Sequence, residues 1–450
     1  MTHQISQHID NNKIFLVKRS EIEGRLEPEF YIPSIAYLEK RIRSLSSHKL
    51  KDYALYIAGG ATPKKTETDK FYSDSESGIP FLRVQNLQTN GELSLDDCIY
   101  VNKDTHNGML KRSQVAGGDL LIKITGVGRM AIASVAPEVF VGNTNQHMVV
   151  IKTGDTTISK YLARYLNLDI IERIASRHST GGTRPALDYP SLKSIPIIEG
   201  IDFSPIDNAI KAKKEKETEA IKIISDIDSY VLRELGIKLP DLKKQNLKDR
   251  VFTTNLSDVI EGRMDPKSVL YLGESAKSIK YQNLQLKQIA IIEKGTAITS
   301  DEVNKKGNYP VIAGGQTSPY NHDIFNYKGD VITVSASGAY SGYVWYHKEP
   351  IFASDCSIIF AKNNQFLTEY IYEVLKAQQA HIYFLQQGSG QPHVYPDDLK
   401  KLWIPVISVE KQHELIDHIT TLRQRAELLK EEGIKLLEDA KRIVEKKILG

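Results

Sequence analysis

Two long stretches of the chain place apolar residues at alternating steps of four and three positions. The first runs from 204 to about 236, and the second from about 409 to 449. This spacing puts the apolar side chains on one stripe of a helix, as in a coiled coil. The seam positions are Ile210, Ile224, Ile227 and Val231 in the first stretch, and Leu415, Ile419, Leu422, Leu429 and Leu436 in the second. A charged amphipathic helix is often only a solvated surface helix, but two of them, each following a similar segment, favour helices that pack along each other.

Each long helix follows a segment in which strand-like and helical patterns alternate. The segment at 50–150 has short apolar runs separated by Gly, Asn and Asp, and a helix is expected at 159–177. A second segment repeats this order, with β-rich sequence at 286–362 and a helix at 366–385. Short apolar runs bounded by turn residues predict strands, whereas longer periodic runs predict helices. The pattern therefore predicts two α+β domains.

Short motifs recur in the same order in the two halves of the chain. Ser20–Pro28 returns as Ser257–Pro266, Gly118–Ile122 as Gly329–Thr333, Gly181–Pro185 as Gly388–Pro392, and Ile195–Ile197 as Ile404–Val406. This repetition indicates a duplicated unit, and a two-copy protein suits a target that is itself read twice. We predict an N-terminal arm at 1–48, a first domain at 49–203, a central helix at 204–238, a second domain at 239–408 with an arm-like lead-in at 247–280, and a final helix at 409–450.

The composition is that of an ordinary folded protein and argues against several classes. The 450 residues are enough for two domains, with 41% hydrophobic and 26% charged residues. A net charge of +3 permits a polyanionic partner without requiring one. Cys98 and Cys356 stand alone, which argues against a zinc site or a disulfide framework and fits a reducing cytoplasm. No apolar run approaches the ~20 residues of a membrane span, so we expect no membrane partner, no metal and a cytoplasmic location.

Three motifs resemble catalytic or cofactor sites but lack the context that such sites need. Gly126–Ala131 matches GxGxxA, yet strand-like sequence follows where a dinucleotide site requires a helix. His413 and His418 are five residues apart, so their side chains do not share one helix face. Pro396–Lys400 has the letters of a nuclease motif without the spacing that brings carboxylates and lysine together. We therefore predict no catalytic residues, with a nuclease or methyltransferase kept as an alternative.

Polar side chains recur where each β-rich domain is expected to present loops. Arg, Asn and Gln can pair with base edges, whereas Lys, Ser and Thr can hold phosphates. The candidate DNA-binding residues of the first domain are Arg83, Gln85, Asn86, Lys123, Arg129, Asn145, Gln146, Arg177, Thr183 and Arg184. Those of the second domain are Gln316, Tyr320, Ser337, Tyr340, Tyr343, Gln387, Ser389 and Gln391. The layout repeats while the residues differ, which predicts that the two domains read different short sequences.

The ordered set of motifs resembles the specificity (S) subunit of type I restriction-modification systems. The resemblance rests on Ile79–Leu87, Gly118–Ile122, Gly181–Arg184 and the Ile-Pro-Ile and Ile-Pro-Val exits, and it covers essentially the whole chain. It implies an α+β fold in which two repeated α/β target-recognition domains are joined by two long antiparallel coiled-coil helices with pseudo-two-fold symmetry. Each domain would read one half of a bipartite double-stranded DNA target, and the helices would set the gap between the halves.

The same resemblance implies partners that carry the chemistry. Two methyltransferase (M) subunits would dock on the arms and helices and bind S-adenosylmethionine, and restriction (R) subunits would cut DNA, so this chain would hold no cofactor of its own. Gln391 stands in the second copy where the first copy has Arg184. A phosphate-binding or base-reading role of Arg184 is therefore less readily transferred to the second copy. A type IIB-like restriction-methylation enzyme uses a similar subunit, and a coiled-coil protein-binding scaffold is a further alternative.

Overall fold

The computed structural model divides into two compact units, each of which includes part of both long helices. It describes residues 10, 12–239, 253, 276–299, 301–303, 306–388 and 390–450. Unit 1 is Met1–Glu215 with Glu431–Gly450, and unit 2 is Lys216–Lys430. The predicted lead-in at 247–280 lies outside the described residues except at 253 and 276–280, and so does the second copy of the Ser20–Pro28 motif.

Unit 1 contains two larger sheets and a layer of helices. One sheet has the order β2-β10-β7-β8 with antiparallel neighbours, and the other has the order β3-β5-β4-β9-β6, in which β4 and β9 are parallel. Its strands are β1 (His48–Lys49), β2 (Tyr56–Gly59), β3 (Tyr72–Ser73), β4 (Ile79–Leu82), β5 (Ile99–Val101), β6 (Gln114–Ala116), β7 (Leu120–Lys123), β8 (Ala133–Val135), β9 (Val141–Thr144), β10 (Met148–Lys152) and β11 (Pro196–Ile197). Its helices are α1 (Pro33–Leu45), α2 (Thr68–Phe71), α3 (Lys103–Asn107), α4 (Thr156–Leu166), α5 (Asp169–Arg177) and α6 (Tyr189–Lys193), with short 3-10 turns η1 (Arg19–Glu21), η2 (Pro28–Tyr31), η3 (Leu50–Tyr53), η4 (Lys65–Glu67), η5 (Val84–Asn86) and η6 (Lys111–Ser113).

Unit 2 repeats this plan with a smaller second sheet. Its main sheet has the order β13-β19-β16-β17, and a second sheet has the order β15-β14-β18, in which β14 and β18 are parallel. Its strands are β12 (Asn283–Gln285), β13 (Ala290–Lys294), β14 (Tyr309–Ile312), β15 (Asn321–His322), β16 (Val331–Ser335), β17 (Val344–His347), β18 (Phe352–Ala353), β19 (Cys356–Ala361) and β20 (Trp403–Pro405). Its helices are α10 (Leu286–Ile289), α11 (Thr368–Lys376), α12 (Gln379–Ile382) and α13 (Pro396–Leu399), with the 3-10 turn η9 (Tyr383–Leu385).

The two units share their order of elements, which confirms the predicted repeated α+β architecture. The sheet β2-β10-β7-β8 has its counterpart in β13-β19-β16-β17, and the parallel pair β4–β9 has its counterpart in β14–β18. In both units a helix follows the second strand of the main sheet order, α4 after β10 and α11 after β19. A two-stranded sheet, β1–β11 in unit 1 and β12–β20 in unit 2, closes each repeat.

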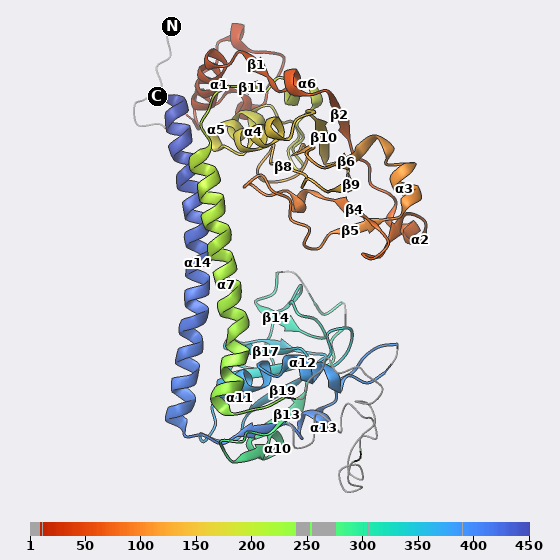
Figure 1. The fold of residues 1–450 in the computed structure, drawn as a ribbon, viewed down its shortest axis with the longest axis vertical. Helices are drawn as coiled ribbons and strands as arrows, with labels where there is room; N and C mark the ends of the chain where they lie inside the picture. The colour runs from red at the N-terminus through yellow and green to blue at the C-terminus, as the bar shows by residue number, and fades with distance from the viewer. Residues whose placement is uncertain are drawn as a thin grey trace. The chain divides into compact units, whose positions relative to one another are not determined.

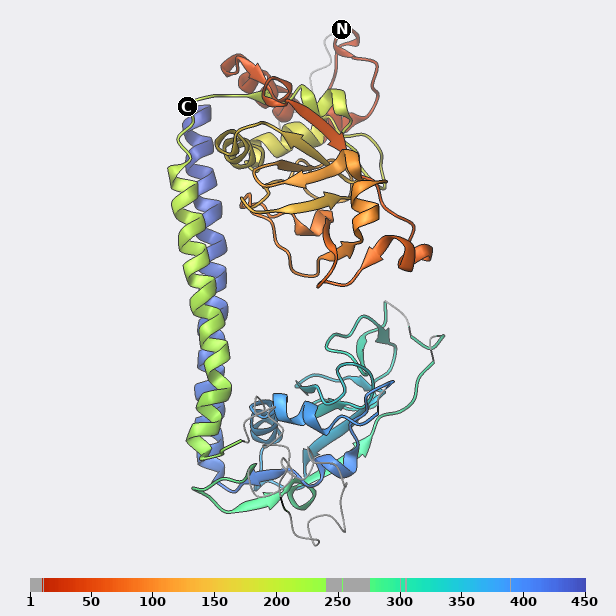
Figure 2. The same cartoon turned by 45° about the vertical axis from the view of Figure 1, so that its right-hand side comes forward.

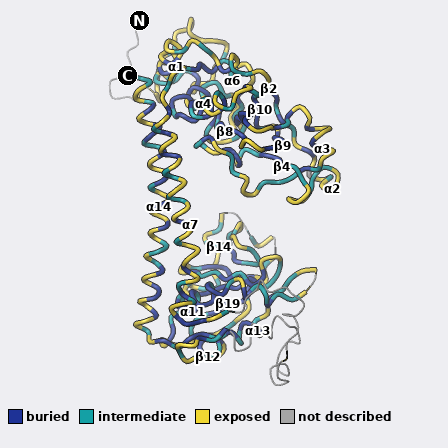
Figure 3. Tube along the Cα trace, viewed as in Figure 1, coloured by how far each residue is buried: buried dark blue, intermediate teal, exposed yellow. Residues whose placement is uncertain are grey.

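The recurring Gly-Asp motif opens a strand that is buried on both faces. In β7, Leu120 and Ile122 pack in the core that contains α4 and α5, while Leu121 packs with Leu82 of the second sheet. Successive side chains of a strand point to opposite faces, so a strand between two layers is apolar at every position. β16 divides its side chains between two cores in the same way. Figure 3 shows the neighbours of these two strands, β10 and β19, mostly in the colour of buried residues.

The two long helices pack antiparallel, as the resemblance implied. α7 spans Ser204–Leu235 and α14 spans Val409–Leu449, and they run side by side in Figures 1 and 2. In unit 1, Ile210 near the start of α7 shares a core with Val444 near the end of α14. In unit 2, Ile227 shares a core with Ile419. None of the helices in the described ranges is long and apolar enough to cross a bilayer.

The seam of these helices departs from the predicted positions at two places. Ile210, Ile227, Val231, Leu415, Ile419 and Leu429 are buried, and Leu422 is half-buried. Ile224 and Leu436 are 43% and 40% exposed, so the prediction is wrong for these two residues. In α14 the buried stripe moves by one position, to Leu437 and Val444, because a helix with 3.6 residues per turn drifts away from a strict seven-residue repeat. In α7 the seam keeps its predicted spacing through the buried Ala220, Ile227 and Val231, and Ile224 alone turns out of it.

Two substitutions in α7, one at a buried and one at an exposed position, test the observed seam. Ile227→Asp places a carboxylate among buried apolar side chains and is expected to lower the free energy of unfolding by about 3 kcal/mol or more. Ile224→Asp adds the same charge on the exposed face and is expected to change it by less than about 0.5 kcal/mol. Denaturant unfolding followed by circular dichroism measures both, and equal losses for the two variants would contradict the observed seam.

Candidate nucleic-acid interface

Three loops of unit 1 are joined by backbone hydrogen bonds where β7 ends. The N–H of Gly126 donates to the carbonyl of Pro185 at 3.0 Å, and the N–H of Leu187 donates to the carbonyl of Ile124 at 2.8 Å. The N–H of Ile124 in turn donates to the carbonyl of His147 at 2.9 Å. These bonds hold together the segments 124–128, 145–147 and 180–186, which we call the loop edge of unit 1.

The same three hydrogen bonds recur in unit 2 where β16 ends. The N–H of Gly338 donates to Pro392 at 3.0 Å, that of Val394 donates to Ala336 at 3.0 Å, and that of Ala336 donates to Asp355 at 3.1 Å. The corresponding segments, 336–340, 353–355 and 387–393 apart from the undescribed position 389, form the loop edge of unit 2. The two edges therefore have equivalent backbone positions, with Pro185 matching Pro392.

Each edge also depends on a glycine at the end of the first strand of the main sheet. A Cβ atom on Gly60 would collide with the carbonyl oxygen of Thr144, and a Cβ atom on Gly295 would collide with that of Ser354. Only glycine lets the two backbones approach this closely. The neighbouring Thr62 hydroxyl bonds to Gln146, which brings the end of β2 to the loop edge of unit 1.

Several predicted site residues are exposed. In unit 1, Thr183 and Arg184 lie exposed on the segment 180–186, which we call the late loop. Gln146 is exposed beside His147, and Gln85 is exposed on η5, away from the bonds that join the loop edge. In unit 2, Gln316, Tyr320, Tyr340 and Gln391 are exposed. Gly338 and Pro392 link the loops that carry Tyr340 and Gln391. Ser389 lies outside the described residues.

Three further candidates of unit 2 are half-buried and engaged in internal contacts. The Ser337 hydroxyl donates to the Asp355 carboxylate, and the Gln387 amide donates to Asp398 Oδ2 at 2.9 Å. The ammonium of Lys376 lies 4.2 Å from the centre of the Tyr343 ring. Gln316 is exposed but its amide lies 3.4 Å from the Tyr383 hydroxyl. Ser337 therefore positions Asp355 of this edge, and Gln387 is bonded to α13.

Three polar residues predicted to contact DNA are buried, so the prediction is wrong for them. Asn86 accepts from the N–H of Arg83 at 2.8 Å and donates to the carbonyl of Ser94 at 2.9 Å. Lys123 is only 3% exposed and donates to the carbonyl of Val127 at 2.8 Å, and burial lowers the pKa of its ammonium. Asn145 is buried and accepts from the N–H of His147. Buried polar groups of this kind are bonded inside the protein and hold turns.

Two arginines predicted to bind DNA instead tie segments of unit 1 together, and Arg83 is partly committed in the same way. Arg129 pairs with Asp169 at 2.5 Å and donates to the carbonyl of Asn167 at 2.6 Å, which anchors the Gly-rich turn to the start of α5. Arg177 pairs with Glu39 of α1 and donates to the carbonyl of Phe30 at 2.6 Å. Half-buried Arg83 donates to the carbonyl of Asp97 at 2.8 Å. Arg129 and Arg177 are therefore engaged in bonds inside unit 1.

Glu39 is the centre of a buried ion cluster between α1 and α5. Its carboxylate pairs with Arg43 at 2.6 Å and with His178 at 2.8 Å, as well as with Arg177. Burial alone would raise the pKa of Glu39, but the hydrogen bonds and charges of His178, Arg177 and Arg43 outweigh it and lower the pKa to about 2. Glu39 is therefore ionised in the folded protein and fixes the segment that leads into the late loop.

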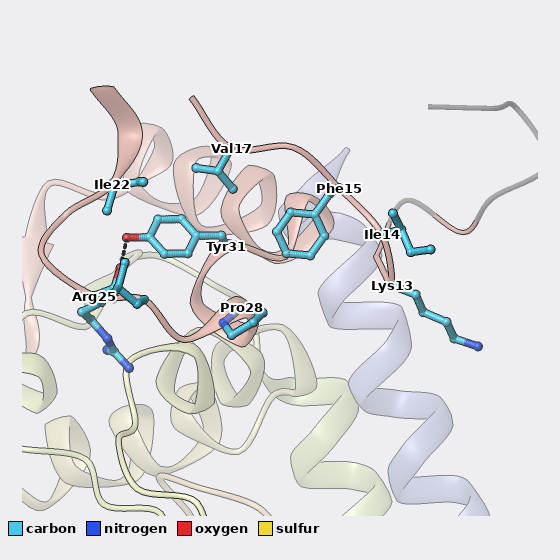
Figure 4. Close-up of a pocket in the computed structure, with 9 residues that line it drawn as sticks. Lys13, Ile14, Phe15, Val17, Ile22, Arg25, Pro28 and Tyr31 are labelled. Atoms are coloured by element: carbon cyan, nitrogen blue, oxygen red, sulfur yellow. Dashed lines mark hydrogen bonds between the residues drawn. The ribbon is translucent and has the colours of Figure 1, made fainter. Parts of the chain in front are cut away.

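The motif Ser20–Pro28, which recurs as Ser257–Pro266, has a structural role in unit 1 that its residue types alone did not indicate. Figure 4 shows Arg25 and Tyr31 at one side of a pocket of about 400 Å³ formed by the N-terminal segment. Tyr31 donates its hydroxyl hydrogen to the carbonyl of Arg25 at 2.8 Å. The guanidinium of Arg25 donates to the carbonyls of His178 and Ser179 at 3.4 and 3.0 Å. The motif thus supports the backbone just before the segment 180–186. In the sequence, only the repetition of the motif in the second half of the chain indicated that it has a role.

A comparison with known protein families matches one part of the chain. Residues 278–438 match the family described as type I restriction modification DNA specificity domain. For this part of the chain the match confirms the resemblance predicted from the sequence. Such a domain recognises DNA and is not the catalytic part of a restriction-modification system. Residues 1–215 of unit 1 repeat the topology of unit 2 and lie outside the match.

Particular relatives are specificity subunits. A putative type I specificity subunit of Mycoplasma genitalium is 27% identical over 141 residues, which are 31% of this chain and 37% of that relative. The chain thus matches little more than a third of the relative's length. Two crystal structures are similar at low identity: the S subunit of a type I system from M. genitalium (15% identity, TM-score 0.40, 90% of this chain and 95% of that one) and the HsdS subunit from Thermoanaerobacter tengcongensis (12%, 0.36, 89% and 96%).

Substitutions of two arginines in unit 1 test which of them stabilises the fold and which is only exposed. Arg177→Ala removes a partner of the buried Glu39 carboxylate and is expected to lower the free energy of unfolding by about 3 kcal/mol. Arg184→Ala removes an exposed side chain and is expected to change it by less than about 0.5 kcal/mol. Thermal melting of both variants tests the assignment, and a larger loss for Arg184→Ala than for Arg177→Ala would reverse it.

Proposed function

We propose that the chain is the DNA-sequence specificity subunit of a restriction-modification complex and binds a bipartite duplex target. The observation that carries the proposal is the match of residues 278–438 to a DNA specificity domain. The repeated fold extends it to unit 1, because the two loop edges have equivalent backbone hydrogen bonds. Two recognition edges in one chain account for a target with two separately read halves.

The loop edges suit base recognition in the major groove. Exposed Arg184, Gln146 and Gln391 can each form paired hydrogen bonds with base edges. Their loops are held by backbone bonds, and the segment before the loop of Arg184 is also held by the buried ion pairs of Glu39, so little conformational freedom is lost when DNA binds. Exposed lysines and arginines elsewhere on the units would supply the phosphate contacts, which set orientation rather than sequence.

The chemistry of modification and cleavage is assigned to partner proteins. We propose that methyltransferase subunits, two per chain, bind S-adenosylmethionine and dock on the arm and long helices, that restriction subunits join this core, and that the complex works in the cytoplasm. The N-terminal segment supports a docking role because Ile14, Leu16 and Leu26 are exposed there. Exposed apolar side chains that are close together commonly mark a protein–protein contact.

An exchange of unit 1 tests the proposal. Residues 50–195 are replaced by the equivalent segment of a relative with a different target, and the joins fall just inside the β1–β11 pair, which stays intact. We expect one half of the methylated sequence to change to that of the donor and the other half to remain. Mapping of methylated adenines in cells that carry the complex gives the result.

As a control, residues 50–195 are replaced by the equivalent segment of a relative that recognises the same target. A coiled-coil scaffold without DNA recognition would leave the methylated sequence unchanged in both exchanges, and this result would contradict the proposal.

A further inference from the structure

The two loop edges carry different chemistry at one equivalent backbone position. The carbonyl of His147 accepts from Ile124 in unit 1, and the carbonyl of Asp355 accepts from Ala336 in unit 2. Asp355 is exposed between the buried residues Ser354 and Cys356. A carboxylate thus stands in unit 2 where unit 1 has an imidazole.

The Asp355 carboxylate is held in place with acceptor capacity left over. The Ser337 hydroxyl donates to its Oδ2 atom. A carboxylate has about four lone-pair positions, so one serine leaves most of them available. Lys294 lines the same cavity, but within the described part of the chain no ion pair joins it to Asp355.

A cavity next to Asp355 gives room for a base edge. It has a volume of about 430 Å³ and is lined by Asp355, Ala336, His393 and Tyr395, among others. The rings of His393 and Tyr395 lie 6.0 Å apart with an angle of 23° between their planes. His393 is itself bound to Gln387 through two backbone hydrogen bonds, at 2.8 and 2.9 Å, so this wall of the cavity belongs to the loop edge.

The electrostatic character of the two edges is opposite at these positions. In unit 1, burial and then the charge of Arg184 lower the pKa of His147, which disfavours a charged imidazolium beside the arginine. In unit 2, Gln391 replaces Arg184 and Asp355 brings a negative charge. A carboxylate is repelled by phosphates, so in a DNA-binding edge its favourable partner is a hydrogen-bond donor on a base.

We propose that Asp355 is a specificity-determining residue that accepts a hydrogen bond from the exocyclic amino group (N4) of a cytosine in the half-site read by unit 2. This inference rests on the proposed function. Carboxylates pair with the cytosine amino group in the major groove, whereas adenine is read by amides, which match its donor and acceptor together. The equivalent position of unit 1, with His147 beside Arg184, lacks this carboxylate and selects a different base.

The experiment compares three forms of the full chain assembled with its methyltransferase partners. Each is used to select bound duplexes from a library of random sequences: the parent, Asp355→Asn and Glu349→Gln. Glu349 is an exposed carboxylate of unit 2 between β17 and β18, so its substitution removes the same charge away from the loop edge. Melting curves verify folding, and Asp355→Glu, which keeps the acceptor but moves it, is the second variant at the site.

For Asp355→Asn and Asp355→Glu we expect the preference for cytosine at one position of one half-site to fall roughly tenfold or more. The other half-site and the Glu349→Gln selection should be those of the parent. If both Asp355 variants keep the parent preference at every position, or if an adenine position relaxes instead, the inference is overturned while the proposed function stands. If the parent itself selects no sequence, the proposed function fails.

Discussion

One backbone hydrogen bond, present in both units, determines how the loop edges are built. The N–H of Gly126 donates to Pro185, and the N–H of Gly338 donates to Pro392. Both glycines have a positive φ, of 122° and 85°, which L-residues with side chains seldom adopt. Proline fixes its own φ and offers only a carbonyl. The late loop is therefore held to the end of the central strand by backbone atoms and not by the side chains that differ between the units.

This arrangement separates the residues that build an edge from those that meet a ligand. Asn86, Lys123, Arg129 and Arg177 are committed to internal bonds, and losing one of them would leave a buried group unpaired. Arg184 and Gln391 lie exposed on loops held by the same backbone bonds. Substitutions at exposed positions cost little stability. A protein built in this way can change what it reads without changing how it folds.

The sequence was sufficient to predict the repeated fold, because its signals are periodic or duplicated. The Gly-Asp motifs open buried strands in both units, and the long helices lie where the four-three spacing placed them. Single seam positions were less predictable. Ile224 and Leu436 fit the four-three spacing, yet both are exposed, whereas Ile227 and Leu437 in the same helices are buried.

The site was only partly predictable, because residue type does not reveal burial. Asn86 and Gln85 are neighbours with similar side chains, yet one is fully buried in a turn and the other is exposed. Nothing in the sequence separates them without the turn geometry. Asp355 was not a candidate, because a carboxylate is an unusual ligand for a polyanion and its place opposite Ser337 depends on residues far apart in the chain.

The most direct measurement of the central claim is an experimental structure of the assembled complex on a duplex that it methylates. The account predicts that base edges lie within hydrogen-bonding distance of side chains from segments 180–186 and 145–147 in unit 1, and from 353–355 and 387–393 in unit 2. Bases contacted from other elements of the units, with both loop edges facing solvent or a protein partner, would contradict it.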